Sequence, residues 1–224
     1  GKWDWKNNYD LYMATREDVS QAFGELRRID GSVFPGTDVH PTLSPDGLEL
    51  IFDSPENSLP RLYYCKRQTT SSEFGEAVRW SVPGFEATEL QRVERPQFTD
   101  PLSVVFVVVS TDGQDRSVWT VKRTAPQSAF GSLREFPVSN PWPAYFVAET
   151  GLRAYCASPT GLSVVGRRSK SDTFGQATPL LDAAVTGAIE GRVWVAPQED
   201  VVFYISAGPG EKPGSSRKLW MVRF

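Results

Sequence analysis

The stretch PTLSPDGLELIFDS, residues 41–54, reads as two short strands joined by a tight turn. Asp46-Gly47 supplies residues that tolerate the left-handed backbone of a hairpin turn, and apolar residues then alternate along the second strand. After a loop, RLYYCKR at 61–67 reads as a third strand and EAVRW at 76–80 as a fourth. The segment therefore predicts a four-stranded antiparallel sheet.

The third strand of this unit recurs along the chain. Four times an apolar run ends in an arginine, and a Phe-Gly pair follows seven residues later. The arginines are Arg16, Arg67, Arg123 and Arg167, and a fifth run, KLWMVRF, ends at Phe224, so the spacings are 51, 56, 44 and 57 residues. A period of roughly 40 to 50 residues made of short strands is typical of a β-propeller, in which each repeat is one blade.

The repeats predict an all-β fold, a small β-propeller of about four to five blades of four-stranded antiparallel sheets. We expect one domain over residues 1–224. Its repeat units are expected at roughly 9–38, 39–90, 91–140, 141–187 and 188–224. Only four innermost strands are recognisable, so the N-terminal repeat is expected either to pair beside the C-terminal strands or to stand as an incomplete fifth blade.

A serine near the end of each second strand suggests a common register. Aligning the four serines places LELIFDS, VVFVVVS, LRAYCAS and DVVFYIS in line without gaps. The serines are Ser54, Ser110, Ser158 and Ser206.

The hairpin PTLSPDGLELIFDS, followed by RLYYCKR and Phe-Gly-Glu, resembles the WD40-like β-propeller repeat of the TolB type. The later copies depart from that pattern, with TDPLSVV, AETGLRA and APQEDVV in place of LSPDGLE. Because the motif specifies turns and packing, the resemblance implies a fold and no chemistry. It also implies a periplasmic or secreted location.

The overall charge excludes several classes of partner. The chain has 24 basic and 27 acidic residues and a formal charge of −3, with no run of five like charges. We therefore expect no nucleic-acid partner and no binding to anionic membranes, both of which need a concentrated basic surface. The longest apolar stretch, 102–109, is too short to insert across a bilayer, which takes about 20 residues.

The serine register brings acidic positions to one end of a central channel. The position three residues before Pro41 is acidic in three of four repeats, and two positions later come His40, Pro96, Ala144 and Arg192. The residues expected at this channel mouth are Asp38, His40, Glu94, Arg95, Trp142, Glu190, Arg192 and Trp194. Carboxylates there could hold a hydrated divalent cation or sugar hydroxyls, and the indoles could stack on a sugar ring. The family resemblance implies another role for Asp38, bracing neighbouring blades by accepting backbone N–H bonds.

The sequence favours a non-enzymatic scaffold or binding module that engages a protein partner or a glycan through its channel mouth or rim. No catalytic residue and no cofactor is assigned, apart from the divalent cation that the mouth could hold. The alternative is a glycoside-active, hydrolase-like propeller that uses Asp38 with Glu94 or Glu190. His40 is the only histidine, which excludes a two-histidine metal site. The repeated arginines are expected to be structural, and Cys65 and Cys156 to be unpaired.

Overall fold

The computed structural model describes most of the chain as short strands. The described residues are 10–18, 20–29, 37–56, 59–85, 91–126, 128–136, 144–148, 150–158, 161–170, 172–182, 186, 189–196, 199–206, 208 and 218–223. Within them, no helix has the length and hydropathy needed to cross a membrane. The chain divides into two compact units, residues 1–136 and 137–224, and the single-domain expectation stays a prediction.

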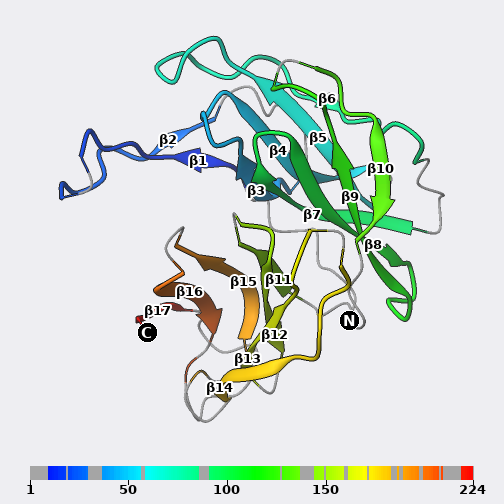
Figure 1. The fold of residues 1–224 in the computed structure, drawn as a ribbon. Helices are drawn as coiled ribbons and strands as arrows, with labels where there is room; N and C mark the ends of the chain where they lie inside the picture. Colours follow the sequence, from blue (N-terminus) through cyan, green and yellow to red (C-terminus); the bar gives the residue numbers. More distant parts are fainter. Residues whose placement is uncertain are drawn as a thin grey trace. The chain divides into compact units, whose positions relative to one another are not determined.

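Within its described residues, the first unit contains two four-stranded antiparallel sheets and one two-stranded sheet (Figure 1). Sheet I has the order β3 (Val39–Leu43), β4 (Glu49–Glu56), β5 (Leu59–Lys66), β6 (Val78–Arg79). Sheet II runs from β7 (Gln91–Asp100) through β8 (Ser103–Ser110) and β9 (Arg116–Lys122) to β10 (Ser132–Glu135). The N-terminal repeat forms β1 (Tyr12–Met13) and β2 (Arg27–Arg28), which pair with each other.

The second unit contains two further sheets. Sheet III has the order β11 (Ala144–Val147), β12 (Arg153–Ser158), β13 (Gly161–Gly166), β14 (Thr178–Asp182). Sheet IV consists of β15 (Ile189–Val195), β16 (Val201–Ser206) and β17 (Lys218–Arg223). The predicted fold class, an all-β chain of consecutive propeller blades built as antiparallel sheets of up to four strands, is confirmed.

The hairpin that opens sheet I forms as its turn residues require. Gly47 adopts a left-handed backbone with φ of 71°, and its N–H donates to the carbonyl of Ser44 at 2.8 Å. The Ser44 hydroxyl donates to the Asp46 carboxylate at 2.5 Å, which closes the turn. The Asp-Gly turn predicted from the sequence is confirmed.

Apolar side chains join neighbouring sheets within each unit. In the first unit, Ile51 and Leu62 of sheet I pack with Val104, Phe106 and other residues of sheet II in one buried cluster. In the second unit, the cluster joins sheets III and IV through residues that include Leu162 and Val202. Burial of these faces supplies most of the driving force that stacks one sheet on the next.

The strand pairing corrects the serine register in sheet II. Glu49 pairs with Lys66 at the start of β4, and Ser103 pairs with Lys122 at the equivalent place in β8, so Val108 corresponds to Ser54. Ser110 lies two residues further on, at the end of β8, where the next turn begins. There its hydroxyl donates to Asp112 at 2.5 Å, as Ser44 does to Asp46. The serine register is therefore wrong in sheet II, because Ser110 closes an Asp-Gly turn and Val108 occupies the position of the strand serines.

The repeated arginines have the same structural task in each repeat. Three of them donate from Nε to a carbonyl of the preceding hairpin turn, at 2.7 Å for Arg67, 2.9 Å for Arg123 and 2.8 Å for Arg167. All four lie over the phenyl ring of the following Phe-Gly pair, 4.5 to 4.7 Å from guanidinium carbon to ring centroid. Their predicted structural role is confirmed, as is the unpaired, buried state of both cysteines.

Candidate functional site

Four of the eight predicted mouth residues lie in the first unit and gather around a carboxylate that was not predicted, Asp53. His40 Nδ1 lies 3.0 Å from both Asp53 oxygens, and the Arg95 N–H donates to Asp53 Oδ1 at 3.2 Å. Trp142 and the side chains of Glu190 and Arg192 lie outside the described residues. The grouping of all eight at one mouth therefore stays a prediction.

Matching bulges bring His40 and Arg95 to Asp53. Pairing shifts register between Val39 and Thr42 in β3 and between Glu94 and Gln97 in β7. In each bulge the residue before a proline has a left-handed backbone, with φ of 53° at His40 and 58° at Arg95. Such a conformation is unfavourable for a residue with a side chain and persists where the surroundings hold it.

Asp53 lies within β4, which contacts β7 of the next sheet. From there its carboxylate reaches both bulges. It is 1% exposed, and its carboxylate accepts from the backbone of β7. The bracing role that the family resemblance implied for Asp38 belongs to Asp53. The sequence held one signal, an acidic residue inside the apolar strand LELIFDS.

Asp38 is buried beside this cluster without being part of its hydrogen bonds. It is 1% exposed, and neither of its carboxylate oxygens has a hydrogen-bond partner among the described residues. Burial, together with the nearby carboxylates of Asp10 and Asp53, raises the pKa of Asp38 to about 6 against the opposing effects of the Ser54 hydroxyl and of Arg28. Asp38 therefore carries a desolvated charge at neutral pH.

The carboxylates of the mouth offer little access to a substrate. Glu94 is 3% exposed, and it forms an ion pair with Arg95, whose Nε lies 3.7 Å from Oε1. A glycosidic acid and base must both reach a sugar ring, so the described carboxylates Asp38 and Glu94 give the hydrolase alternative no support. Among the described residues, no three metal-ligating side chains come close enough to hold a metal ion.

Trp194 lies on β15 in the second unit and exposes 47% of its surface. Its indole contacts two phenyl rings, with centroids 6.3 Å from Phe146 and 5.3 Å from Phe203. It is thus a partly exposed member of an aromatic group. One supported indole face is the kind of surface on which a sugar ring can stack.

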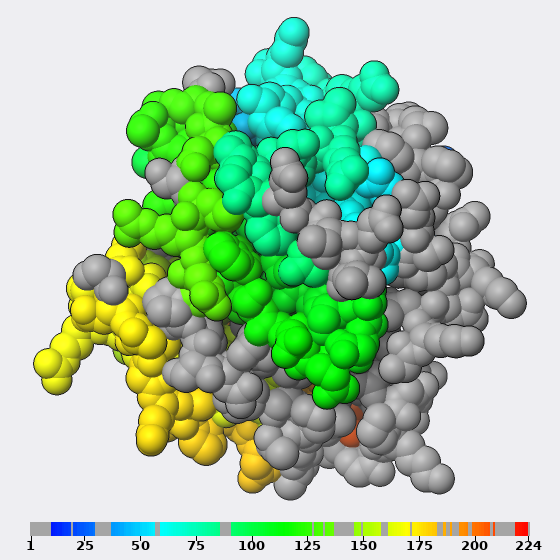
Figure 2. Space-filling model, turned by 90° about the vertical axis from the view of Figure 1, so that its right-hand side faces the viewer, coloured from blue at the N-terminus to red at the C-terminus, as the bar shows by residue number. Residues whose placement is uncertain are grey.

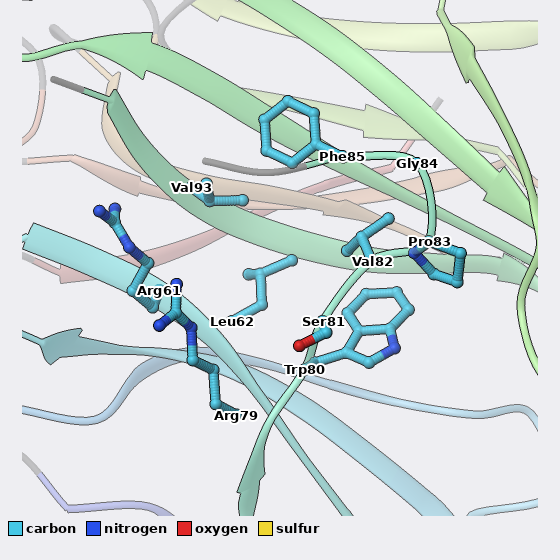
Figure 3. Close-up of a pocket in the computed structure, with 10 residues that line it drawn as sticks. All are labelled: Arg61, Leu62, Arg79, Trp80, Ser81, Val82, Pro83, Gly84, Phe85 and Val93. Carbon is cyan, nitrogen blue, oxygen red and sulfur yellow. The ribbon is translucent and has the colours of Figure 1, made fainter. Parts of the chain in front are cut away.

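A hollow that the sequence did not predict opens in the first unit beside the strand β5. It has a volume of about 640 Å³, and its lining includes Arg61, Leu62, Arg79, Trp80, Phe85 and Val93. Figure 3 shows the two guanidinium groups together at one end and Trp80, Val82 and Pro83 at the other. Volumes of roughly 300 to 1,000 Å³ with apolar walls and a few polar groups are typical of ligand sites.

A second hollow of about 350 Å³ adjoins the first and shares Trp80, Ser81 and Pro83 with it. Its other walls include Tyr64, Lys66 and Phe130. We call the two hollows together the Trp80 groove. It lies on the part of the unit formed by β5 to β10, whose cyan and green atoms form a continuous surface in Figure 2.

Trp80 is held in place by the aromatic core beneath the groove. Its ring meets Phe130 edge-on at a centroid distance of 5.3 Å and Phe106 at 6.5 Å, and Phe85 lies 5.8 Å from Phe106. Such edge-to-face contacts add to the stabilisation from burial. The rings that line the groove are therefore preorganised.

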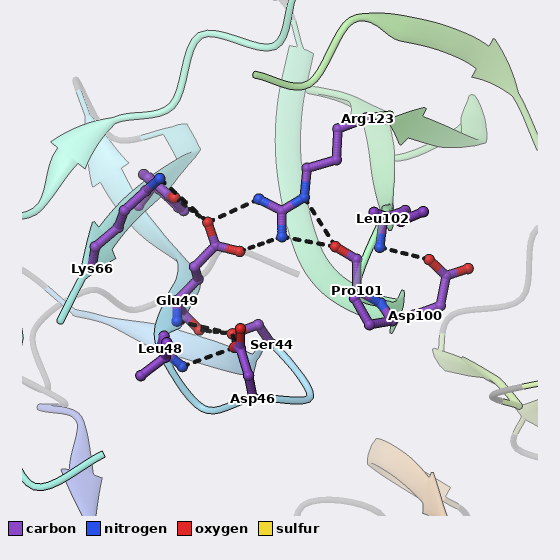
Figure 4. Close-up of polar contacts among 10 residues, drawn as sticks. Ser44, Asp46, Leu48, Glu49, Lys66, Asp100, Pro101, Leu102 and Arg123 are labelled. Atoms are coloured by element: carbon purple, nitrogen blue, oxygen red, sulfur yellow. Dashed lines mark hydrogen bonds and ion pairs between the residues drawn. The ribbon is translucent and has the colours of Figure 1, made fainter. Parts of the chain in front are cut away.

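Arg123, which lines the second hollow, forms a buried ion pair with Glu49 (Figure 4). The guanidinium of Arg123 donates to both oxygens of Glu49, at 2.9 and 2.5 Å, and the Tyr64 hydroxyl donates to Oε1 at 2.5 Å. Burial alone would raise the pKa of Glu49, but these bonds and the charges of Arg123 and Lys66 together lower it. Glu49 stays ionised and holds sheets I and II together.

Comparisons with known proteins leave the family open. No protein-family model matches the chain, and no curated protein matches it either, so membership of the WD40-like repeat family stays a prediction. The solved structures that are similar to the chain include the following two. TolB from Acinetobacter baumannii has a TM-score of 0.49 and 15% identity over 89% of this chain and 43% of its own. A functionally unknown protein from Desulfotomaculum acetoxidans has a TM-score of 0.45 and 8% identity over 87% and 55%.

The chain thus spans 43% and 55% of the length of these two proteins. At TM-scores below 0.5, these likenesses do not bear on the activity, which has to be argued from the residues of the chain.

Proposed function

We propose that this protein is a non-enzymatic binding module that holds a peptide segment of a protein partner in the Trp80 groove. The observation that carries the proposal is the pair of adjoining hollows, about 640 and 350 Å³, that share Trp80, Ser81 and Pro83. An elongated groove lined by aromatic rings suits an extended chain, because rigid aromatic anchors dominate the binding energy of protein interfaces.

The charged groups of the first unit support binding over catalysis. Asp53 and Glu49 are engaged in hydrogen bonds that join sheets I and II, and Asp38 and Glu94 are buried. The groove presents guanidinium, ammonium and aromatic groups, which bind and orient a ligand without reacting with it. A glycan at Trp194 is the second candidate, supported by the exposure of that indole. A periplasmic or secreted location stays part of this proposal.

The test is selection from a library of displayed random peptides with the full chain as bait. The variant is Trp80→Leu, and the matched control is Trp220→Leu, a partly buried indole of the second unit that lies outside the groove lining. We expect selected peptides to lose at least about tenfold in affinity with Trp80→Leu and to keep it with Trp220→Leu, as for an aromatic anchor.

Melting temperatures of both variants separate folding defects from binding defects. A library that yields no binder would overturn the proposal, as would equal losses in the two variants. Binding of oligosaccharides with quenching of tryptophan fluorescence, in place of peptide selection, would favour the glycan candidate.

A further inference from the structure

The two ends of the Trp80 groove carry exposed cations. Arg79 lines the first hollow and Lys66 the second, and their side chains are 50% and 53% exposed. Arg79 Nη1 lies 3.1 Å from Glu56 Oε1, and Lys66 Nζ lies 3.5 Å from Glu49 Oε1. Exposed pairs of this kind are weak, so both cations can exchange these partners for a ligand carboxylate at little cost.

The charge balance at the groove is positive. At the Lys66 end, Glu49 is already matched by the bidentate guanidinium of Arg123, so the ammonium is an additional positive charge. At the other end, Arg61 and Arg79 lie near one carboxylate, Glu56. Burial and the charge of Arg79 lower the pKa of Arg61, and Glu56 opposes this shift. A ligand that carries negative charge at both ends complements this pattern.

The strand pairing separates the two cations. Arg79 pairs with Tyr63, and Lys66 follows three residues later on β5, so the two backbone positions are about 10 Å apart along the strand and their side chains leave opposite faces of sheet I. Arg79 lies on the edge strand β6, and both side chains line the Trp80 groove. In a polyproline II helix, residues i and i+3 lie on the same side and about 9 Å apart. Grooves lined by aromatic rings are the usual receptors for such helices.

Resting on the proposed function, we infer that the Trp80 groove binds an acidic, proline-containing segment whose carboxylates reach Arg79 and Lys66 at its two ends. The intervening prolines pack on the rings of Trp80 and Phe85. Acidic residues set the register of the ligand, and the rings supply most of the affinity.

The experiment measures fluorescence anisotropy of three labelled peptides with the full chain. Each has Gly-Ser flanks and a core of Glu-Pro-Pro-Glu, Gln-Pro-Pro-Gln or Lys-Pro-Pro-Lys. We expect the Glu peptide to bind tightest and to weaken with rising salt, because exposed charges are screened. Arg79→Glu should weaken the Glu peptide about two- to fivefold and strengthen the Lys peptide, the range for an exposed pair.

Lys66→Gln should weaken the Glu peptide in the same direction. The matched control is Lys122→Glu, because Lys122 takes the position of Lys66 in sheet II, is exposed, and lies outside the groove lining. It should leave all three affinities unchanged within about twofold, as expected for a charge that touches no ligand.

Equal affinities for the three peptides, or equal effects of Arg79→Glu and Lys122→Glu, would overturn the inference. If no designed peptide binds, the displayed library decides. Trp80-dependent binders enriched in acidic residues support the inference, whereas Trp80-dependent binders without that enrichment overturn it and leave the proposed function standing. A library without any binder removes the proposed function itself.

Discussion

The interface between sheets I and II differs from that between sheets III and IV in the charge it buries. The first residue of the second strand is Glu49 in sheet I and Arg153 in sheet III, as the pairing with Lys66 and Gly166 shows. Glu49 binds Arg123 with side-chain exposures of 7% and 2%, whereas Arg153, 60% exposed, reaches Glu199 at 3.2 Å. One position in the repeat thus carries opposite charges in two interfaces.

The difference shows which contacts the repeat requires. The turn-capping arginine and its Phe-Gly partner are present in both units, at nearly equal distances. The polar contacts between sheets vary with the local sequence, and the apolar clusters are common to both. Packing and turns therefore define the blade, while the interface position is free to specialise.

The largest expected effect tests the buried ion pair. Glu49→Ala should lower the free energy of unfolding by about 3–5 kcal/mol, because it leaves the Arg123 charge buried without its partner. Glu199→Ala should cost about 1 kcal/mol, since its partners Arg153 and Tyr155 regain water or keep other contacts. Urea unfolding measures both.

Equal losses in the two variants would show that the interfaces do not differ as described. The double variant Glu49→Leu/Arg123→Met serves as the control. It removes both charges and should recover most of the lost stability, because an apolar pair of similar volume avoids the cost of desolvation.

The next effect concerns the buried carboxylate of Asp38, which directly precedes β3. Asp38→Asn should raise the free energy of unfolding by about 1–2 kcal/mol at pH 7, because the ionised Asp38 is buried without hydrogen bonds. The folded-state pKa of about 6 lies above the ordinary aspartate pKa of 3.8, so between these pH values the folded state binds more protons. Wild-type stability relative to the variant therefore falls as pH rises from about 4 to 6.

Urea unfolding of both proteins at pH 4 and pH 7 checks this prediction, and the difference between them isolates Asp38 from the other titrating groups. A gain at pH 7 that persists unchanged at pH 4 would contradict a titration of Asp38. Amide hydrogen exchange should show the added protection in β4 and not in β16, which belongs to the second unit.

The smallest effect tests what the two units share. Arg67→Ala and Arg167→Ala should each lower stability by about 1 kcal/mol, through loss of the bond to the turn carbonyl and of the contact with the phenyl ring. Thermal unfolding compares the two. A loss confined to one variant would mean that the repeated arginine has a different task in each unit.

Much of the fold could be predicted because its determinants are local. The Asp46-Gly47 turn, the arginine and the Phe-Gly pair act within a few residues of one another, so they are legible in the sequence. The register error at Ser110 has the same origin, since a serine before Asp-Gly closes a turn wherever it occurs. Local signals identify a turn but not which end of the sheet holds it.

The candidate site was predictable only in part. Their positions in the repeat predicted Asp38, His40, Glu94 and Arg95 as site residues, and these four lie near one another in the first unit. Asp53 was missed because its importance depends on a backbone N–H 42 residues away. The Trp80 groove was missed because a hollow depends on how side chains from β5, β7 and the segment after β6 fill space.

The sequence by itself determined the blades of this protein: the strands, the turns and the arginine that ties each turn to its Phe-Gly pair. These follow from backbone preferences and contacts between residues close in the chain. Only the tertiary structure decided which charges are buried and paired, as with Glu49 and Arg123, and where the surface opens beside Trp80. Desolvation and cavity shape depend on residues far apart in sequence, and no local pattern encodes them.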